Sequence, residues 1–243
     1  RNLRKVRIIM FGYEPEYIDC GDARIACYDI GRGRPLILLH GNGEDSSYWN
    51  AQISEFTRFM RVIAVDSRGH GASDSGSQGL SFDLMAHDLK RVLDSKGIRI
   101  VVDATRDLLM KVLPYHPFLI KPNNHELGEI FGVELKTRES VVPYAKQLQK
   151  KGAQNVLVSM AGEGAVLVAA SGEVFEAPAP KGKLINGVGA GDSMVAGFMA
   201  GYMEKEDYLH AFHMGIAAGS ASAFSENLAT REEIASVYEQ ITK

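Results

Sequence analysis

The chain has 243 residues, of which 45% are hydrophobic and 23% charged, with a formal net charge of -3. This length accommodates one large α/β domain or two small ones. The negative balance excludes the broad positive surface that nucleic acids and anionic membranes require, so neither is an expected partner. No apolar run approaches the roughly 18 residues of a membrane span, and the sequence shows no leader pattern. We therefore expect a soluble, cytoplasmic protein.

Short apolar runs in the first 65 residues predict β-strands, because they are rich in Val, Ile and Leu and end at Gly, Pro or Asp. They cover residues 6–11, 24–28, 36–39 and 62–65. Apolar spacing of three to four residues predicts helices over 47–59 and 81–95, the second capped by Ser81. The two cysteines, Cys20 and Cys27, are too few for a disulfide framework and are expected as reduced thiols.

Strands and helices continue to alternate in the second half, which favours a mostly parallel sheet covered on both faces. The segments concerned are 98–102, 108–113, 118–120, 125–131, 139–151 and 156–158. Two closely spaced runs, 165–169 and 173–176, predict an antiparallel hairpin at one edge. The chain then turns helical, over 192–204, 208–224 and 231–241. Small residues in the middle helix ("GIAAGSASA") predict that its backbone packs closely against a neighbour.

A glycine-turned loop, "HGNG", follows the predicted strand at 36–39 and consists of His40, Gly41, Asn42 and Gly43. A loop of this form can aim backbone N–H groups at the oxyanion that develops during acyl transfer. Together with the preceding hairpin and "DSRGHGASD" (66–74), it resembles the α/β-hydrolase fold family over residues 16–97. That resemblance implies an oxyanion loop and, further along, a serine nucleophile.

The nucleophile does not follow. A GxSxG elbow, which lifts the serine of such hydrolases above the sheet, occurs nowhere in the sequence. The nearest approach is "GDSMV", which contains Ser193 but lacks the second glycine. The late histidines, His210 and His213, lie in an apolar helical stretch without the surroundings of a triad. We interpret the loop at 40–43 as vestigial, with an esterase as the least favoured function.

The stretch "NGVGAGDSMVAGF" (186–198) predicts an anion site. Its glycines free the backbone so that successive N–H groups can converge, and a helix that begins near Asp192 adds the positive end of its dipole. A carboxylate there can act as general base for a hydroxyl that attacks a phosphoryl group. A glycine-rich helix start with an acidic cap is also ordinary structure, so this stretch alone decides little.

A second pattern, NxxE, runs from Asn123 to Glu126 within "FLIKPNNHELGEIFG" (118–132). By itself it is more typical of a helix cap than of a metal site. Combined with "VSMAGEGAVLV" (158–168), "VVDATRDLLMKVLPYHP" (101–117) and the glycine-rich stretch, however, it resembles the ribokinase-like (PfkB) sugar kinases over residues 98–243.

This resemblance implies roles for individual residues. Gly189, Ala190 and Gly191 would form the anion hole, and Asp192 would be the catalytic base. Asn123 and Glu126 would organise magnesium through water. The residues that would face the nucleotide phosphates are Lys121, Ser159, Gly162 and Gly164. Adenine would lie near 211–227. One departure is Gly187, where the family usually has a small hydroxyl residue.

The two resemblances divide the chain into a hydrolase-like half, 1–97, and a kinase-like, nucleotide-binding half, 98–243, with no linker between them. Two bare sheet edges favour pairing with each other, so we expect one domain with a single, doubly wound, mostly parallel sheet and an antiparallel edge hairpin. Such a junction favours a recombined or engineered chain without a complete active site. It would retain at most a half-site for Mg-ATP, phosphate or sulfate. The alternative is a weak ATPase or sugar-phosphate kinase using Asp192, and the oligomeric state is left open.

Overall fold

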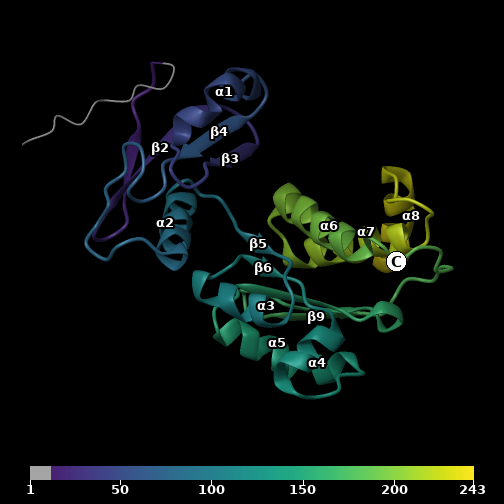
Figure 1. The fold of residues 1–243 in the computed structure, drawn as a ribbon. Coiled ribbons are helices and arrows are strands. Elements are labelled where there is room, and N and C mark those ends of the chain that lie inside the picture. Colours follow the sequence, from purple (N-terminus) through teal and green to yellow (C-terminus); the bar gives the residue numbers. More distant parts are fainter. Residues whose placement is uncertain (1–11) are drawn as a thin grey trace, which may run out of the picture. The chain divides into compact units, whose positions relative to one another are not determined.

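The computed structural model describes residues 12–243 and divides between Arg99 and Ile100 into two compact units (Figure 1). The strand expected at 6–11 lies outside the described residues. Within 12–243, no helix combines the length and the apolar character needed to cross a bilayer. The two units are taken in turn.

The first unit is built on a four-stranded sheet in the order β1-β2-β4-β3. β3 and β4 run parallel, while β1–β2 and β2–β4 are antiparallel. The elements are β1 (Glu16–Asp19), β2 (Arg24–Gly31), β3 (Pro35–Leu39), α1 (Asn50–Phe56), β4 (Arg61–Val65) and α2 (Phe82–Ser95), with a 3₁₀ turn at Ser46–Trp49. Alternation along the strands supplies two apolar faces. Val62 and Ala64 pack toward α1, whereas Ile63 and Val65 pack toward α2.

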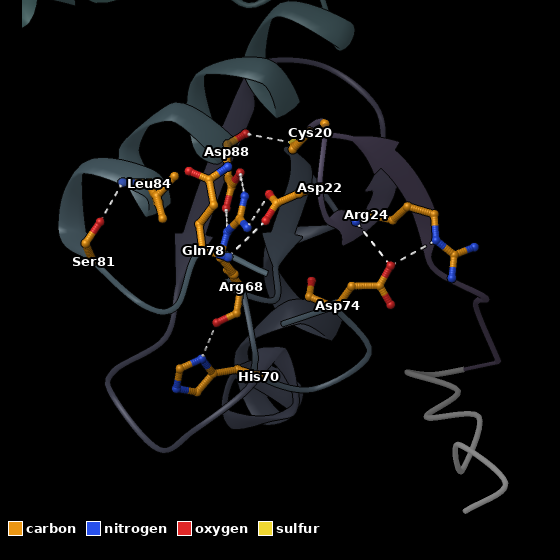
Figure 2. Close-up of polar contacts among 12 residues, drawn as sticks. Cys20, Asp22, Arg24, Arg68, His70, Asp74, Gln78, Ser81, Leu84 and Asp88 are labelled. Carbon is orange, nitrogen blue, oxygen red and sulfur yellow. Dashed lines mark hydrogen bonds and ion pairs between the residues drawn. The ribbon is translucent and has the colours of Figure 1, made fainter. Parts of the chain in front are cut away.

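A buried ion-pair network fixes the loop after β4 (Figure 2). The Arg68 side chain is only 1% exposed, and its Nε and Nη2 donate to the two carboxylate oxygens of Asp88 on α2, both at 2.8 Å. Its Nη1 donates to Asp22 at 2.6 Å. The hydrogen bond from Arg68 is the largest of several effects that hold the pKa of Asp22 well below its usual value. The network therefore ties the β4 loop both to helix α2 and to the turn after β1.

The second unit is a three-layer α/β/α arrangement around a five-stranded sheet, β5-β6-β7-β8-β9. β5, β6 and β7 are parallel, and β8 and β9 form an antiparallel hairpin at the edge, as the sequence predicts. The strands are β5 (Val101–Val102), β6 (Leu119–Ile120), β7 (Asn155–Ser159), β8 (Ala165–Val168) and β9 (Val174–Ala177). The helices are α3 (Arg106–Val112), α4 (Asn124–Phe131), α5 (Arg138–Lys150), α6 (Ala190–Lys205), α7 (Tyr208–Ala223) and α8 (Arg231–Thr242).

Helices cover both faces of this second sheet. Val156 and Val158 pack with α3, α4 and α5, whereas Leu157, between them on β7, packs with α6 and α7. Glycines allow α6 and α7 to approach closely: a Cβ on Gly197 would stand 2.5 Å from the carbonyl oxygen of Met214. This close contact fixes α6 against α7.

The expectation of one continuous, mostly parallel sheet is wrong, because the described residues form two separate sheets in which four of the seven strand pairings are antiparallel. β4 lies between β2 and β3, so only β1 and β3 remain as edges of the first sheet. The strand expected to extend it, β5, has two residues and pairs with β6 alone. So short a strand offers few ladder hydrogen bonds and little buried side-chain area to a second neighbour. Length alone does not prevent this, because β6 is equally short and pairs on both sides. Helices on both faces of an α/β structure are confirmed.

Candidate functional site

The N-terminus of α6 is exposed and shaped by a glycine. Gly189 caps the helix with φ 77°, the left-handed conformation that glycine adopts most easily. Its carbonyl oxygen accepts the hydrogen bond of the Ser193 N–H at 2.8 Å. Asp192 lies in the first turn with its side chain exposed. The Ala190 N–H also has a partner, since it donates to the Gly187 carbonyl at 3.3 Å. The N–H groups of a first helical turn carry partial positive charge, so those of Gly191 and Asp192 can hold an anion beside a carboxylate.

Lys121 brings a full positive charge to the same turn. It follows β6 directly, and its side chain is only 8% exposed. A Cβ placed on Gly191 would stand 3.1 Å from the Lys121 Nζ, so the ammonium lies against the first turn of α6. Its counter-ion is Asp103, whose Oδ2 is 3.5 Å away. The structure thus places Lys121 beside Gly191, in the helical turn that also contains Ala190 and Asp192 and follows the cap Gly189. The roles that the resemblance implies for these residues stay predictions.

The predicted metal-organising pair, Asn123 and Glu126, forms a capping box at the start of α4. The Glu126 N–H donates to Asn123 Oδ1 at 2.9 Å, and the Asn123 N–H donates to Glu126 Oε2 at 2.8 Å. Among residues 12–243, no three His, Cys, Asp or Glu side chains gather closely enough to hold a metal directly. Binding of magnesium through water by this pair stays a prediction of the resemblance.

Of the other expected phosphate-facing residues, only Ser159 is placed next to this pair. It ends β7, forms an isolated parallel bridge with Asn123, and its N–H donates to the carbonyl of Pro122 at 3.2 Å. The backbone explains why residue 164 is glycine: its φ is 95°, and a Cβ placed there would overlap the carbonyl oxygen of Ala177. Nothing lies within 4 Å of the position where a Cβ of Gly162 would be.

Asp103 is the site residue that the sequence analysis missed. It follows β5, just as Lys121 follows β6 and Ser159 ends β7. In open parallel sheets, ligands bind outside the carboxyl ends of the strands. The available signal was the polar residue immediately after the apolar pair of "VVDAT" (101–105), but its pairing with Lys121 depends on strand order.

In the first unit, the "HGNG" loop borders a cavity of about 300 Å³. Two N–H groups of this loop already have partners: Gly41 donates to Glu44 Oε2 at 3.0 Å, and Gly43 donates to His70 Nε2 at 3.3 Å. The Ser67 N–H donates to His40 Nε2 at 2.9 Å. Because Nε2 accepts, the donor on this ring is Nδ1, which donates to the Gly41 carbonyl at 2.7 Å. An oxyanion would have to displace these partners.

Ser193 and the late histidines do not form a triad. The Ser193 hydroxyl accepts a hydrogen bond from Ser222 at 2.8 Å. The imidazole of His210 interacts with Tyr238 and Glu204. Burial, with a smaller effect of His210, lowers the pKa of His213. The geometry supports packing roles for both histidines.

Two family models match the sequence. The model of the pfkB family of carbohydrate kinases matches residues 72–235, and that of the α/β hydrolase fold matches residues 34–102. The two matches are compatible with a junction of two unlike halves at about 97–98. That junction, with its assignment of each half to a family, stays a prediction.

Named relatives and solved structures agree with the first match. A 1-phosphofructokinase of Bacillus subtilis is 50% identical over 137 residues, 56% of this chain and 45% of the relative. A D-tagatose-1-phosphate kinase of Bacillus licheniformis is 33% identical over 60% of this chain and 48% of the relative. Phosphofructokinase-2 of Escherichia coli, solved with substrates and products, aligns with a TM-score of 0.60 and 27% identity over 68% of this chain and 54% of that one. The chain thus spans about half the length of these relatives.

These relatives overturn the expected function. We expected a recombined or engineered chain without a complete active site, and this prediction is wrong, because the matched proteins are phosphofructokinases and a related sugar-phosphate kinase. The alternative, a sugar-phosphate kinase, fits better, and its use of Asp192 stays a prediction.

Proposed function

Because the chain belongs to the pfkB family of carbohydrate kinases, we propose that it transfers the γ-phosphoryl group of Mg-ATP to a hydroxyl group of a ketohexose 1-phosphate. The observation that carries the proposal is the position of the Lys121 ammonium against the α6 turn that bears Asp192. Relatives that act on 1-phosphofructose and D-tagatose 1-phosphate supply the substrate class.

The backbone and Lys121 stabilise charge in this mechanism. Phosphoryl transfer spreads negative charge over the equatorial oxygens of the moving group, and catalysis consists mainly of positioning and charge stabilisation. In this proposal, the N–H groups at the start of α6 and the buried Lys121 ammonium bind these oxygens. Because both are held before the reaction, they need little reorganisation during it.

Asp192 moves the proton. The acceptor hydroxyl gives its proton to the Asp192 carboxylate as its oxygen forms a bond to the γ-phosphorus, and the bond between that phosphorus and the β–γ bridging oxygen breaks. The products are a sugar bisphosphate and ADP, and the proton on Asp192 passes to solvent. The exposure of Asp192 suits this task, since an acceptor can reach it from outside.

The capping box fits a magnesium ion held through water. Each side chain uses one oxygen atom within the box, and a carboxylate has about four lone-pair sites on its two oxygens. Asn123 and Glu126 would thus orient water ligands of the ion. Magnesium, which keeps several waters when bound, would neutralise phosphate charge when present.

The test is an assay of fructose 1-phosphate with Mg-ATP, detecting both ADP and the sugar bisphosphate by mass spectrometry. Asp192→Asn is expected to lower kcat by about 10² to 10⁴, the usual contribution of a positioned acid or base. Glu239→Gln, an exposed change on α8, is the matched control and should leave kcat unchanged. Turnover that survives Asp192→Asn, or no bisphosphate from folded wild-type protein, contradicts the proposal.

A further inference from the structure

Lys121 is a buried cation in an unfavourable electrostatic position. Its side chain is 8% exposed, so most of its hydration is lost. The first turn of α6, against which it lies, is the positive end of a 16-residue helix. Burial and the helix dipole therefore both disfavour an ammonium ion at this point. A negative charge near the ammonium must offset these two effects whenever no phosphate is bound.

Asp103 provides the offset. Its Oδ2 lies 3.5 Å from the Lys121 Nζ, close enough for an ion pair but longer than a charge-assisted hydrogen bond of about 2.7 to 2.9 Å. The Asp103 side chain is 37% exposed, so water can solvate its carboxylate when the Lys121 ammonium pairs with another anion. The ion pair is therefore a long one between a buried cation and a carboxylate that water can solvate.

We propose that Asp103 is a positioning residue that acts through Lys121 as a placeholder counter-ion, exchanged for a phosphate group when the site fills. Asp103 holds the ammonium beside the α6 turn in the empty site, and an entering phosphate then replaces the carboxylate as its partner. The two anions compete for one cation. This inference deepens the proposed function, on which it rests for the identity of the phosphate donor, but the competition itself concerns any phosphate anion.

The proposal predicts opposite effects of Asp103→Asn on binding and on turnover. Removing the competing charge should tighten the binding of inorganic phosphate by about threefold to tenfold, since an opposite charge at this distance stabilises the lysine in the empty site. Without its placeholder, Lys121 is less precisely held, so kcat should fall. A purely structural role for Asp103 would weaken both together.

The experiment is a double-mutant cycle read by titration with inorganic phosphate, followed by ³¹P NMR. Wild type, Asp103→Asn, Lys121→Met and the double variant are compared, with thermal unfolding of each to verify folding. If Asp103 acts through Lys121, its substitution should tighten phosphate binding in the wild-type background and have no effect in the Lys121→Met background. Asp107→Asn, an exposed acidic change four residues further along the chain, should leave phosphate affinity unchanged.

The outcomes separate this inference from the proposed function. Weaker or unchanged phosphate binding in Asp103→Asn, the same effect with and without Lys121, or no phosphate binding by folded wild type overturns the placeholder. Phosphate binding with the expected coupling, but no bisphosphate product from Mg-ATP, overturns the proposed kinase and leaves the placeholder standing.

Discussion

The ion pair between Arg68 and Asp88 offers a quantitative test of what holds the first unit together (Figure 2). Asp88→Asn replaces two charge-assisted acceptors, each 2.8 Å from a guanidinium nitrogen, with one amide oxygen and a donor that faces another donor. Removing one partner of a buried pair costs about 3 to 5 kcal/mol. Because Asp22 still accepts from Arg68 Nη1, we expect the lower end, about 3 kcal/mol.

The assay is urea denaturation followed by the fluorescence of Trp49, the single tryptophan of the sequence, which lies in the first unit. With an m-value of about 2 kcal/mol/M, the midpoint for Asp88→Asn should fall by about 1.5 M. The matched control is Asp94→Asn on the same helix, whose side chain is 56% exposed and pairs with Lys90. Such a surface pair contributes only about 0.3 to 0.5 kcal/mol. A midpoint shift for Asp88→Asn no larger than that of the control would refute the reasoning.

Further predictions concern acid, thiol reactivity and a turn. The hydrogen bond from Arg68, the largest effect, holds the folded-state pKa of Asp22 below the usual 3.8. The stability it adds is present above pH 3.8 and is lost as pH falls below that value. The urea midpoint of Asp22→Asn should therefore decrease less between pH 5 and pH 3 than that of wild type. Burial is the main effect that raises the pKa of Cys27 to about 11, so Ellman's reagent at pH 8 should modify it only after denaturation, and rapid modification of both native thiols would contradict this. Gly164→Ala should destabilise the second unit by more than about 1 kcal/mol because of its positive φ and backbone overlap, whereas Gly162→Ala should cost almost nothing; equal melting temperatures by circular dichroism would argue against the turn geometry.

Local signals in the sequence predicted most of the elements correctly. The helix expected at 81–95 is α2, and Ser81 caps it by accepting from the Leu84 N–H at 3.2 Å. The small residues of α7 do mark a close approach, since Gly219 faces the carbonyl of Ala190. Capping and helix packing depend on residues near in sequence or on a repeated pattern, so they can be predicted without a fold.

Strand pairing was less predictable. The sequence indicated strands on both sides of residue 97, but it could not show that β5 would be two residues long and pair only with β6. The ion pair between Asp103 and Lys121 has the same origin: the two residues are 18 positions apart, and only the parallel pairing of β5 with β6 makes them neighbours. The pairing of β5 and the ion pair both depend on tertiary structure, which no local sequence pattern encodes.

The glycine-rich stretch at 186–198 indicated a helix start with an exposed carboxylate, and α6 begins there. Its role as an anion site stays a prediction, and the chemistry assigned to it came from the resemblance. A left-handed glycine cap and an exposed carboxylate are also found in helices that bind nothing. What distinguishes α6 is the buried ammonium of Lys121 beside its first turn, which a sequence alone does not reveal.

The most direct test of the account is a calorimetric titration with Mg-ATP. Gly191→Val would place side-chain atoms where the Lys121 ammonium lies, since even a Cβ at this position stands 3.1 Å from Nζ. Ala196→Val, an exposed change on the same helix, is the matched control. The account predicts saturable binding by wild type and Ala196→Val, with affinity lowered at least about tenfold, or 1.4 kcal/mol, in Gly191→Val. No binding by folded wild type, or equal affinity in all three proteins, would contradict the placement of the nucleotide phosphates at the start of α6.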